Sequence, residues 1–111
     1  MVTLDIISSR PRHETLDAVK QAVATASGWI AAHHFYSSKA ATLQTMIERG
    51  QLLTFVKSLQ QAGLLSEQSA DAATLKKLYQ KDDETELTVT CALTFAGDEP
   101  ELRLTIPAVP G

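Results

Sequence analysis

The sequence predicts an α+β fold in which helices pack on one face of an antiparallel sheet. Apolar residues alternate with polar ones near both ends of the chain, in residues 2–7 and 86–95, as expected for half-buried strands. Between them, residues 16–26 and 49–64 repeat apolar residues at spacings of three and four, as expected for helices. A length of 111 residues predicts a single domain, residues 1–111.

The first predicted strand, residues 2–7, begins almost at the first residue. Pro11 suits the first turn of the helix that follows, and Ser27 and Gly28 are expected to end it. The buried face of that helix is predicted to consist of Leu16, Val19, Val23 and Ala26.

Residues 29–36 and 41–48 predict two strands of a hairpin, and the loop length decides which side chains face the core. A loop with an even number of residues directs Ile30, Ala32, His34 and Tyr36 inward. An odd number directs Trp29, Ala31, His33 and Phe35 inward. The sequence leaves both registers open, and in either one the first strand carries apolar side chains on both faces.

The strongest helical pattern covers residues 49–64, with Gly63 as its expected left-handed cap. Its buried stripe is Leu52, Phe55, Val56 and Leu59. A shorter helix is predicted within residues 66–80, with Ala72, Leu75 and Leu78 inward.

The clearest strand is residues 86–95, where Leu87, Val89, Cys91, Leu93 and Phe95 share one side. Residues 96–100 predict a turn, after which residues 101–106 are expected to extend the sheet as a hairpin. Leu102, Leu104 and Ile106 would then face inward.

The predicted element order is therefore β-α-β-β-α-(α)-β-β. Its first six main elements resemble the ferredoxin-like superfold, an antiparallel sheet with helices on one face. The resemblance rests on element order and covers most of the chain. It implies no particular function, because that superfold hosts enzymes, metabolite sensors and RNA-binding proteins.

Two adjacent histidines, His33 and His34, lie in the predicted strand 29–36. Consecutive side chains of a strand point to opposite faces, so the pair cannot bind one metal ion together. We therefore expect one histidine in the core and one on the surface, with neither a metal site nor a cofactor.

A second candidate site lies where the first helix begins, at Arg10, Arg12 and His13. Helix N-termini attract anions, and arginine adds paired hydrogen-bond donors for a carboxylate or phosphate. The ferredoxin-like resemblance also implies that this loop is a common place for a small ligand. The alternative is an ordinary exposed loop, in which Glu14 and Asp17 already complement the helix dipole.

The helix-free face of the sheet is predicted to be rich in threonine. A solvated face is one interpretation. The other is that an aromatic residue and Met46 mark a patch on which a second copy stacks its own sheet. A homodimer through this face, or through an edge strand, is therefore expected. Besides side chains of strand 29–36, the face would carry Thr3, Asp5, Ile7, Thr42, Gln44, Met46, Thr88, Thr90, Thr94, Arg103 and Thr105.

Composition excludes several function classes. The net charge is −3 and the ten lysines and arginines are scattered, which argues against nucleic-acid binding. A single cysteine, Cys91, permits no internal disulfide and no multi-cysteine zinc site. No stretch is apolar enough to span a membrane, so a cytoplasmic protein is expected. Neither a nucleophile motif nor grouped glycines occur, and no catalytic residue is assigned.

These observations favour a small non-catalytic domain that binds a small anionic metabolite or a protein partner, as a homodimer. One alternative is a small cytoplasmic enzyme in which His33 or His34 is a general acid or base and an arginine holds an anionic substrate. Another is a protein-interaction adaptor. A closed pocket with the open-face histidine beside Arg10 or Arg12 would favour the enzyme, and a flat surface would argue against it.

Overall fold

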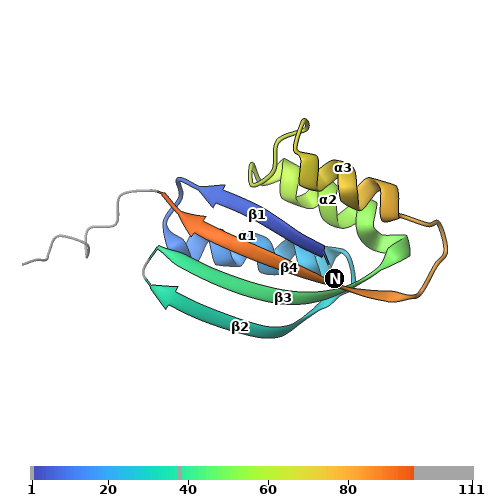
Figure 1. Ribbon diagram of the computed structural model, residues 1–111, viewed down its shortest axis with the longest axis horizontal. Helices are drawn as coiled ribbons and strands as arrows, with labels where there is room; N and C mark the ends of the chain where they lie inside the picture. Colours follow the sequence, from blue (N-terminus) through green and yellow to red (C-terminus); the bar gives the residue numbers. More distant parts are fainter. Residues whose placement is uncertain (1, 38, 97–111) are drawn as a thin grey trace, which may run out of the picture.

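The computed structural model describes residues 2–37 and 39–96. These residues form a four-stranded sheet and three α-helices, which confirms the predicted α+β class (Figure 1). The strands are β1 (Val2–Ser8), β2 (Trp29–Ser37), β3 (Ala40–Glu48) and β4 (Glu86–Phe95). The helices are α1 (Arg12–Thr25), α2 (Leu52–Gln61) and α3 (Ala70–Leu78), with a 3-10 turn η1 (Arg49–Gln51) before α2.

The strands lie in the order β1-β4-β3-β2, and the sheet is mixed. β4 pairs parallel to β1 and antiparallel to β3, so the expectation of a wholly antiparallel sheet is wrong. The reason is the connection through α2 and α3. This segment leaves the sheet at Glu48, the end of β3, and returns at Glu86, directly opposite. β4 therefore starts at the same end of the sheet as β1 and runs in the same direction. The ferredoxin-like arrangement is not confirmed, because β4 separates β1 from β3.

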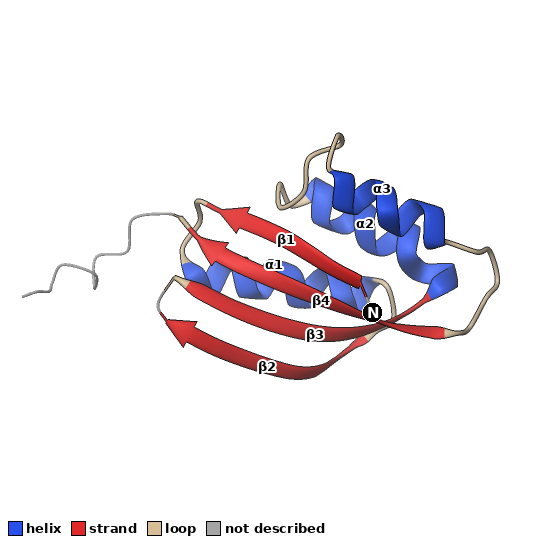
Figure 2. Cartoon of the chain, in the orientation of Figure 1, coloured by secondary structure: helices blue, strands red, loops and turns tan. Residues whose placement is uncertain are grey.

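All three helices contribute to one core on a single face of the sheet. α1 runs behind the strands and α3 packs against α2 and β1 (Figures 1 and 2). The predicted stripe of α2 is confirmed, since all four of its residues are fully buried. The sheet contributes Leu4, Ile6, Ala41, Leu43, Ile47, Val89, Cys91, Leu93 and Phe95 to the same core.

The polar groups inside this core are hydrogen-bonded. The hydroxyls of Ser8 and Thr15 lie 2.7 Å apart and join the end of β1 to α1. The hydroxyl of Thr45 donates to the carbonyl of Val89 at 2.8 Å, across the β3–β4 pair. These bonds satisfy groups whose burial would otherwise destabilise the fold.

The first helix ends at Ser27 and Gly28, as predicted. Its left-handed residue is Ser27, with φ of 58°, and the N–H of Gly28 donates to the carbonyl of Val23 at 2.9 Å. Glycine is required at position 28 because a side chain would not fit there, since a Cβ would lie 2.5 Å from the carbonyl oxygen of Met46. The predicted cap of α2 is confirmed, since Gly63 has φ of 78°.

The β2–β3 hairpin contains parts of both registers that the sequence allowed. Ile30 pairs with Thr45 and faces the core side, but the pairing shifts by one residue at Ala31. Beyond that bulge His33 pairs with Leu43 and Phe35 with Ala41, so the odd residues now face the helix side. A single register for the whole strand was therefore a wrong assumption.

β4 is paired on both sides over most of its length, with β3 from Glu86 to Thr94 and with β1 from Val89 to Phe95. Phe95, its last residue, is opposite Ser8 of β1, and its N–H donates to the carbonyl of Lys39. The N–H of Ala96 still donates to the carbonyl of Ser8. Residues 101–106, the predicted last strand, lie outside the described residues, but β4 offers them no edge for a hairpin.

Candidate protein-binding surface

The open face of the sheet, defined here as the face without helices, carries three of the four large hydrophobic side chains that are exposed among the described residues. Its exposed apolar and aromatic side chains are Ile7 (71% exposed), Trp29 (50%) and Tyr36 (67%). Its centre carries uncharged side chains from β3 and β4, namely Thr42, Gln44, Met46, Thr88, Thr90 and Ala92.

Charged side chains on the open face lie at its rim. Asp5 belongs to the edge strand β1, and Glu48 and Glu86 pair with each other at the strand ends. A centre without charge and a charged rim are the distribution found in protein–protein interfaces.

β2 provides most of the aromatic surface, because this edge strand carries Trp29, Phe35 and Tyr36, all of them exposed (Figure 1). His34 stacks on Tyr36 with ring centres 6.4 Å apart, on the open face. The hydroxyl of Tyr36 lies 3.4 Å from that of Thr42. On the opposite face His33 packs against Phe35 at 5.3 Å. Aromatic rings held by such contacts form a surface that loses little side-chain entropy on binding.

Both histidines are exposed, so the prediction of one histidine in the core is wrong. Alternation does place them on opposite faces, since His33 is opposite Leu43 and His34 is opposite Thr42. The helix side of β2 nevertheless lies beyond the edge of the helix layer, and Phe35 beside His33 is also half-exposed. A position that faces the helix side is therefore exposed where no helix packs over it, as at His33 and Phe35.

Arg10, Arg12 and His13 lie where α1 begins, as the sequence predicted. Pro11 caps the helix without a side-chain hydrogen bond. The guanidinium of Arg10 extends toward Gly63, with Nη2 3.4 Å from the point where a Cβ at Gly63 would lie. Arg10 thus faces the C-terminal end of α2, where a positive charge stabilises the helix dipole.

The structure does not bring the two sets of candidate residues together. The loop with Arg10 and Arg12 follows β1, whereas His33 and His34 lie on β2, the opposite edge of the sheet. Three strand spacings, about 14 Å, separate these edges. His34 lies on an exposed strand beside threonine, which is the arrangement that argues against a histidine–arginine active site. Within residues 2–37 and 39–96, His, Cys, Asp and Glu do not form a group of three that could hold a metal ion.

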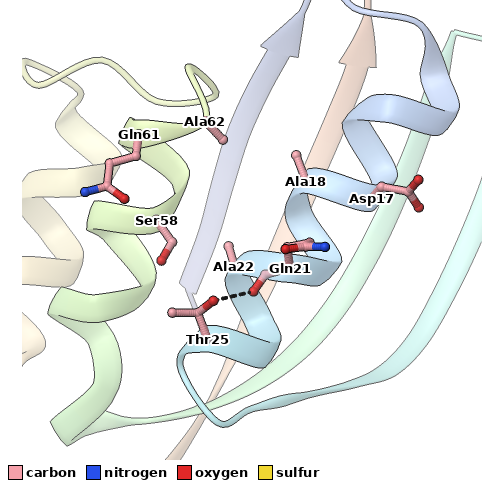
Figure 3. Close-up of a pocket in the computed structure, with 8 residues that line it drawn as sticks. All are labelled: Asp17, Ala18, Gln21, Ala22, Thr25, Ser58, Gln61 and Ala62. Carbon is pink, nitrogen blue, oxygen red and sulfur yellow. Dashed lines mark hydrogen bonds between the residues drawn. The ribbon is translucent and has the colours of Figure 1, made fainter.

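A polar groove of about 470 Å³ lies between α1 and α2 (Figure 3). Small side chains such as Ala18, Ala22 and Ala62 leave the space between the two helices unfilled there. The hydroxyl of Thr25 donates to the carbonyl of Gln21 at 2.8 Å. Asp17 supplies the negative charge at one end. The groove has no cationic side chain in its lining and so does not suit an anion.

A smaller hollow of about 220 Å³ lies at the acidic connector between α3 and β4, lined by Glu48, Gly50, Gln51, Asp82, Asp83 and Glu84. The carboxylate of Asp83 accepts hydrogen bonds from within its own turn. Hydrogen bonds from the hydroxyl and the N–H of Thr85 hold the pKa of Asp83 below its ordinary value. The turn also binds the 3-10 helix, because the N–H of Gly50 donates to the carbonyl of Asp83 at 2.9 Å. The connector is thus a structural turn.

Cys91 is fully buried in the centre of β4. Burial raises the pKa of its thiol from 9.0 to about 12. The thiolate is therefore scarcely populated at neutral pH, and the residue acts as a small core side chain.

Sequence reasoning did not identify two features of this surface. One is the bulge at Ala31, for which no glycine or other local signal exists. The other is the exposure of Phe35 on the helix side, which depends on β2 being the edge strand.

No protein-family model, curated protein or solved structure matches this chain. No helix of the described residues is long and apolar enough to cross a membrane.

Proposed function

We propose that this protein is a small non-catalytic domain that binds a protein partner through the open face of its sheet, and that the partner is a second copy of the chain. The observation that supports it is a sheet face without helices whose exposed large side chains are Ile7, Trp29 and Tyr36. Aromatic side chains are enriched in protein–protein interfaces relative to the rest of the protein surface.

The size of the face suits a dimer. Four strands at about 4.8 Å spacing and nine residues at about 3.3 Å rise give a planar area on the order of 600 Å². Stable interfaces bury about 800 Å² of accessible surface per partner, and accessible surface exceeds planar area because side chains corrugate it. Two such faces stacked about 10 Å apart form a sandwich of two sheets, in which Trp29 and Tyr36 become buried.

A small anionic ligand bound at Arg10, Arg12 and His13 is a weaker proposal. Arg10 already faces the end of α2, and His33 and His34 belong to the other edge of the sheet. The enzyme alternative has less support still, since among the described residues Arg10 and Arg12 follow β1 while His33 and His34 lie on β2, at the opposite edge of the sheet. A cytoplasmic location stays a prediction from the sequence.

The test is the mass of the full chain in solution, measured by sedimentation equilibrium. The wild type should have twice the 12.0 kDa mass of the chain. Gln44→Lys places a charge at the exposed centre of the open face and should give a monomer, because a buried unpaired charge opposes association. Gln61→Lys makes the same change at an exposed position of α2 and should leave the dimer intact.

A wild type that remains monomeric at all concentrations would overturn the proposal. So would a Gln44→Lys variant that keeps the wild-type mass.

A further inference from the structure

One row of side chains crosses the open face from one edge of the sheet to the other. Asp5 of β1 is opposite Ala92 of β4, and Ala92 is opposite Thr42 of β3. Thr42 is in turn opposite His34 of β2. Asp5 and His34, at the two ends of the row, are both exposed. A carboxylate and an imidazole therefore lie at the same level on opposite edges of one face.

Asp5 and His34 cannot pair within one chain. β4 and β3 lie between their strands, so three strand spacings, about 14 Å, separate them. The groups that face His34 are the ring of Tyr36 on β2 and the side chain of Thr42 on β3. β2 contains no Asp, Glu, Lys or Arg, and the one charged residue of β3, Glu48, is at its far end. The four described strands therefore place no carboxylate beside this imidazole.

The two edges of the sheet differ in charge. At the β1 edge, the carboxylate of Asp71 accepts the N–H of Asp5 at 2.8 Å, so two acidic residues lie there. The β2 edge has no acidic residue and carries His33 and His34. Opposite charge at opposite edges makes the open face complementary to itself. Two copies related by a twofold axis use the same surface on both sides, so they require such a face.

Two open faces can stack about a twofold axis in two simple ways. With the axis parallel to the strands, β1 of one copy lies over β2 of the other, and β4 lies over β3. Asp5 of each copy then faces His34 of the other. With the axis across the strands, β1 lies over β1, which brings the two Asp5 carboxylates to one edge. Like charges that face each other oppose association, so the charges favour the axis parallel to the strands.

The distances allow this pairing. Stacked sheets lie about 10 Å apart, a gap that the side chains of Asp5 and His34 can bridge from its two sides. Aligned sheets cross at about 30°, which moves an edge side chain about 4 Å along the facing strand, roughly one residue. The acidic pair Glu48 and Glu86 lies three rows beyond Val89, the partner of the first described residue of β1. It is therefore outside the four-stranded overlap, where salt screens its charge.

The same arrangement covers the two most exposed apolar side chains of the face. Ile7 is level with Ser37, through Thr94 and Ala40, and Ser37 directly follows Tyr36 in β2. Ile7 of one copy would therefore lie over Tyr36 of the other. In the single chain these side chains are 71% and 67% exposed.

We propose that the two copies of the dimer are related by a twofold axis parallel to the strands, and that Asp5 of each copy pairs with His34 of the other. This inference rests on the proposed function, because it needs a dimer formed through the open face. The two reciprocal pairs select one direction and one register among the ways in which two such faces can stack. Selecting an arrangement is the usual role of charge pairs in an interface.

The experiment measures the dimer dissociation constant of the full chain by sedimentation equilibrium at about pH 6. Histidine is the side chain whose charge changes between about pH 5 and 8, so this pH allows an imidazolium. The wild type is compared with His34→Asp and with the double variant Asp5→His, His34→Asp. His33→Asp is the matched control, because His33 is the neighbouring exposed residue on the other face of the same strand.

His34→Asp places a carboxylate opposite Asp5 in both halves of the dimer, and should raise the dissociation constant at least about tenfold. The double variant exchanges the two groups and restores opposite charges, so its dissociation constant should return to within about threefold of the wild type. His33→Asp should keep the wild-type value.

A second measurement needs no variant to fold. In a wild-type dimer of one isotope-labelled and one unlabelled copy, the methyl groups of Ile7 should give nuclear Overhauser effects to the ring of Tyr36 in the other copy. Within one chain these residues lie on opposite edges of the sheet, so the effect reports the arrangement of the two copies.

Three results would overturn this arrangement while the dimer itself stands. They are a His34→Asp variant with wild-type affinity, a double variant that stays as weak as His34→Asp, and contacts of Ile7 with β1 of the other copy in place of Tyr36. In each case the wild type still has twice the mass of the chain and Gln44→Lys still dissociates it. A wild type that is monomeric at all concentrations would overturn both the arrangement and the proposed function.

Discussion

The carboxylate of Asp71, at the start of α3, accepts a hydrogen bond of 2.8 Å from the backbone N–H of Asp5, in the edge strand β1. Sixty-six positions separate the two residues in the chain, so the bond ties the last helix to the first strand. It makes the two edges of the sheet unequal, because α3 stands against β1 while His33 to Ser37 of β2 are all exposed. The predictions below follow from this asymmetry and from the burial around it.

Replacing Asp71 should loosen the β1 edge. Asp71→Ala removes the acceptor and should lower the free energy of unfolding by about 1 kcal/mol. Asp71→Asn keeps an oxygen acceptor and should recover most of this loss. Urea denaturation measures both values, and amide exchange at Asp5 reports the bond itself. An Asp5 amide that exchanges equally fast in all three proteins would contradict this role.

The two histidines of β2 should be equally dispensable for stability. His33 and His34 are both exposed, so replacing either with alanine should change the free energy of unfolding by less than about 0.5 kcal/mol. Thermal or urea unfolding of the two variants is the measurement. A loss well above about 1 kcal/mol in only one of them would show that its imidazole is buried after all.

Cys91 should be inert in the native state. Burial raises the pKa of its thiol from 9.0 to about 12, so the folded protein holds this proton where the unfolded chain releases it. The free energy of unfolding should therefore fall as the pH rises above about 9. Cys91→Ala should remove this part of the pH dependence. Thiol labelling should be slow in buffer and accelerate in urea, and rapid labelling of the native protein would contradict the burial.

Gly28 should tolerate no side chain. A Cβ there would lie 2.5 Å from the carbonyl oxygen of Met46 and 2.6 Å from Cδ1 of Ile47, so α1 and β3 must separate to admit it. Gly28→Ala should cost about 1–3 kcal/mol of stability, the range for overpacking. Gly50→Ala is the matched control, because its closest contact would be 3.1 Å, and it should cost less. Equal losses in the two variants would contradict the close approach at Gly28.

Local patterns predicted the elements well. The apolar stripe of α2 and the alternation of β4 predicted burial correctly. In each case the core lies on one side of the element, so the position of a residue along the helix or strand decides whether it is buried. Gly63 was predicted as a cap for a similar reason, since the left-handed backbone position after a helix favours glycine.

Long-range relationships were not predictable from these patterns. The order β1-β4-β3-β2 depends on where the connection through α2 and α3 returns the chain, and the sequence does not encode that in any local window. The same order makes β2 an edge strand, and His33 and Phe35 are exposed although they face the helix side because no helix packs over that part of β2. The bulge at Ala31 likewise arises from pairing with β3.

The most direct test of the proposed dimer is the fluorescence of Trp29, the one tryptophan of the chain, measured against protein concentration. Trp29 is half-exposed on the open face of a single chain. Association through that face should shift its emission to shorter wavelength and reduce its quenching by acrylamide, over the same concentrations at which the mass doubles. A mass that doubles while the emission and quenching of Trp29 stay constant would contradict the account, because the chains would then associate through another surface.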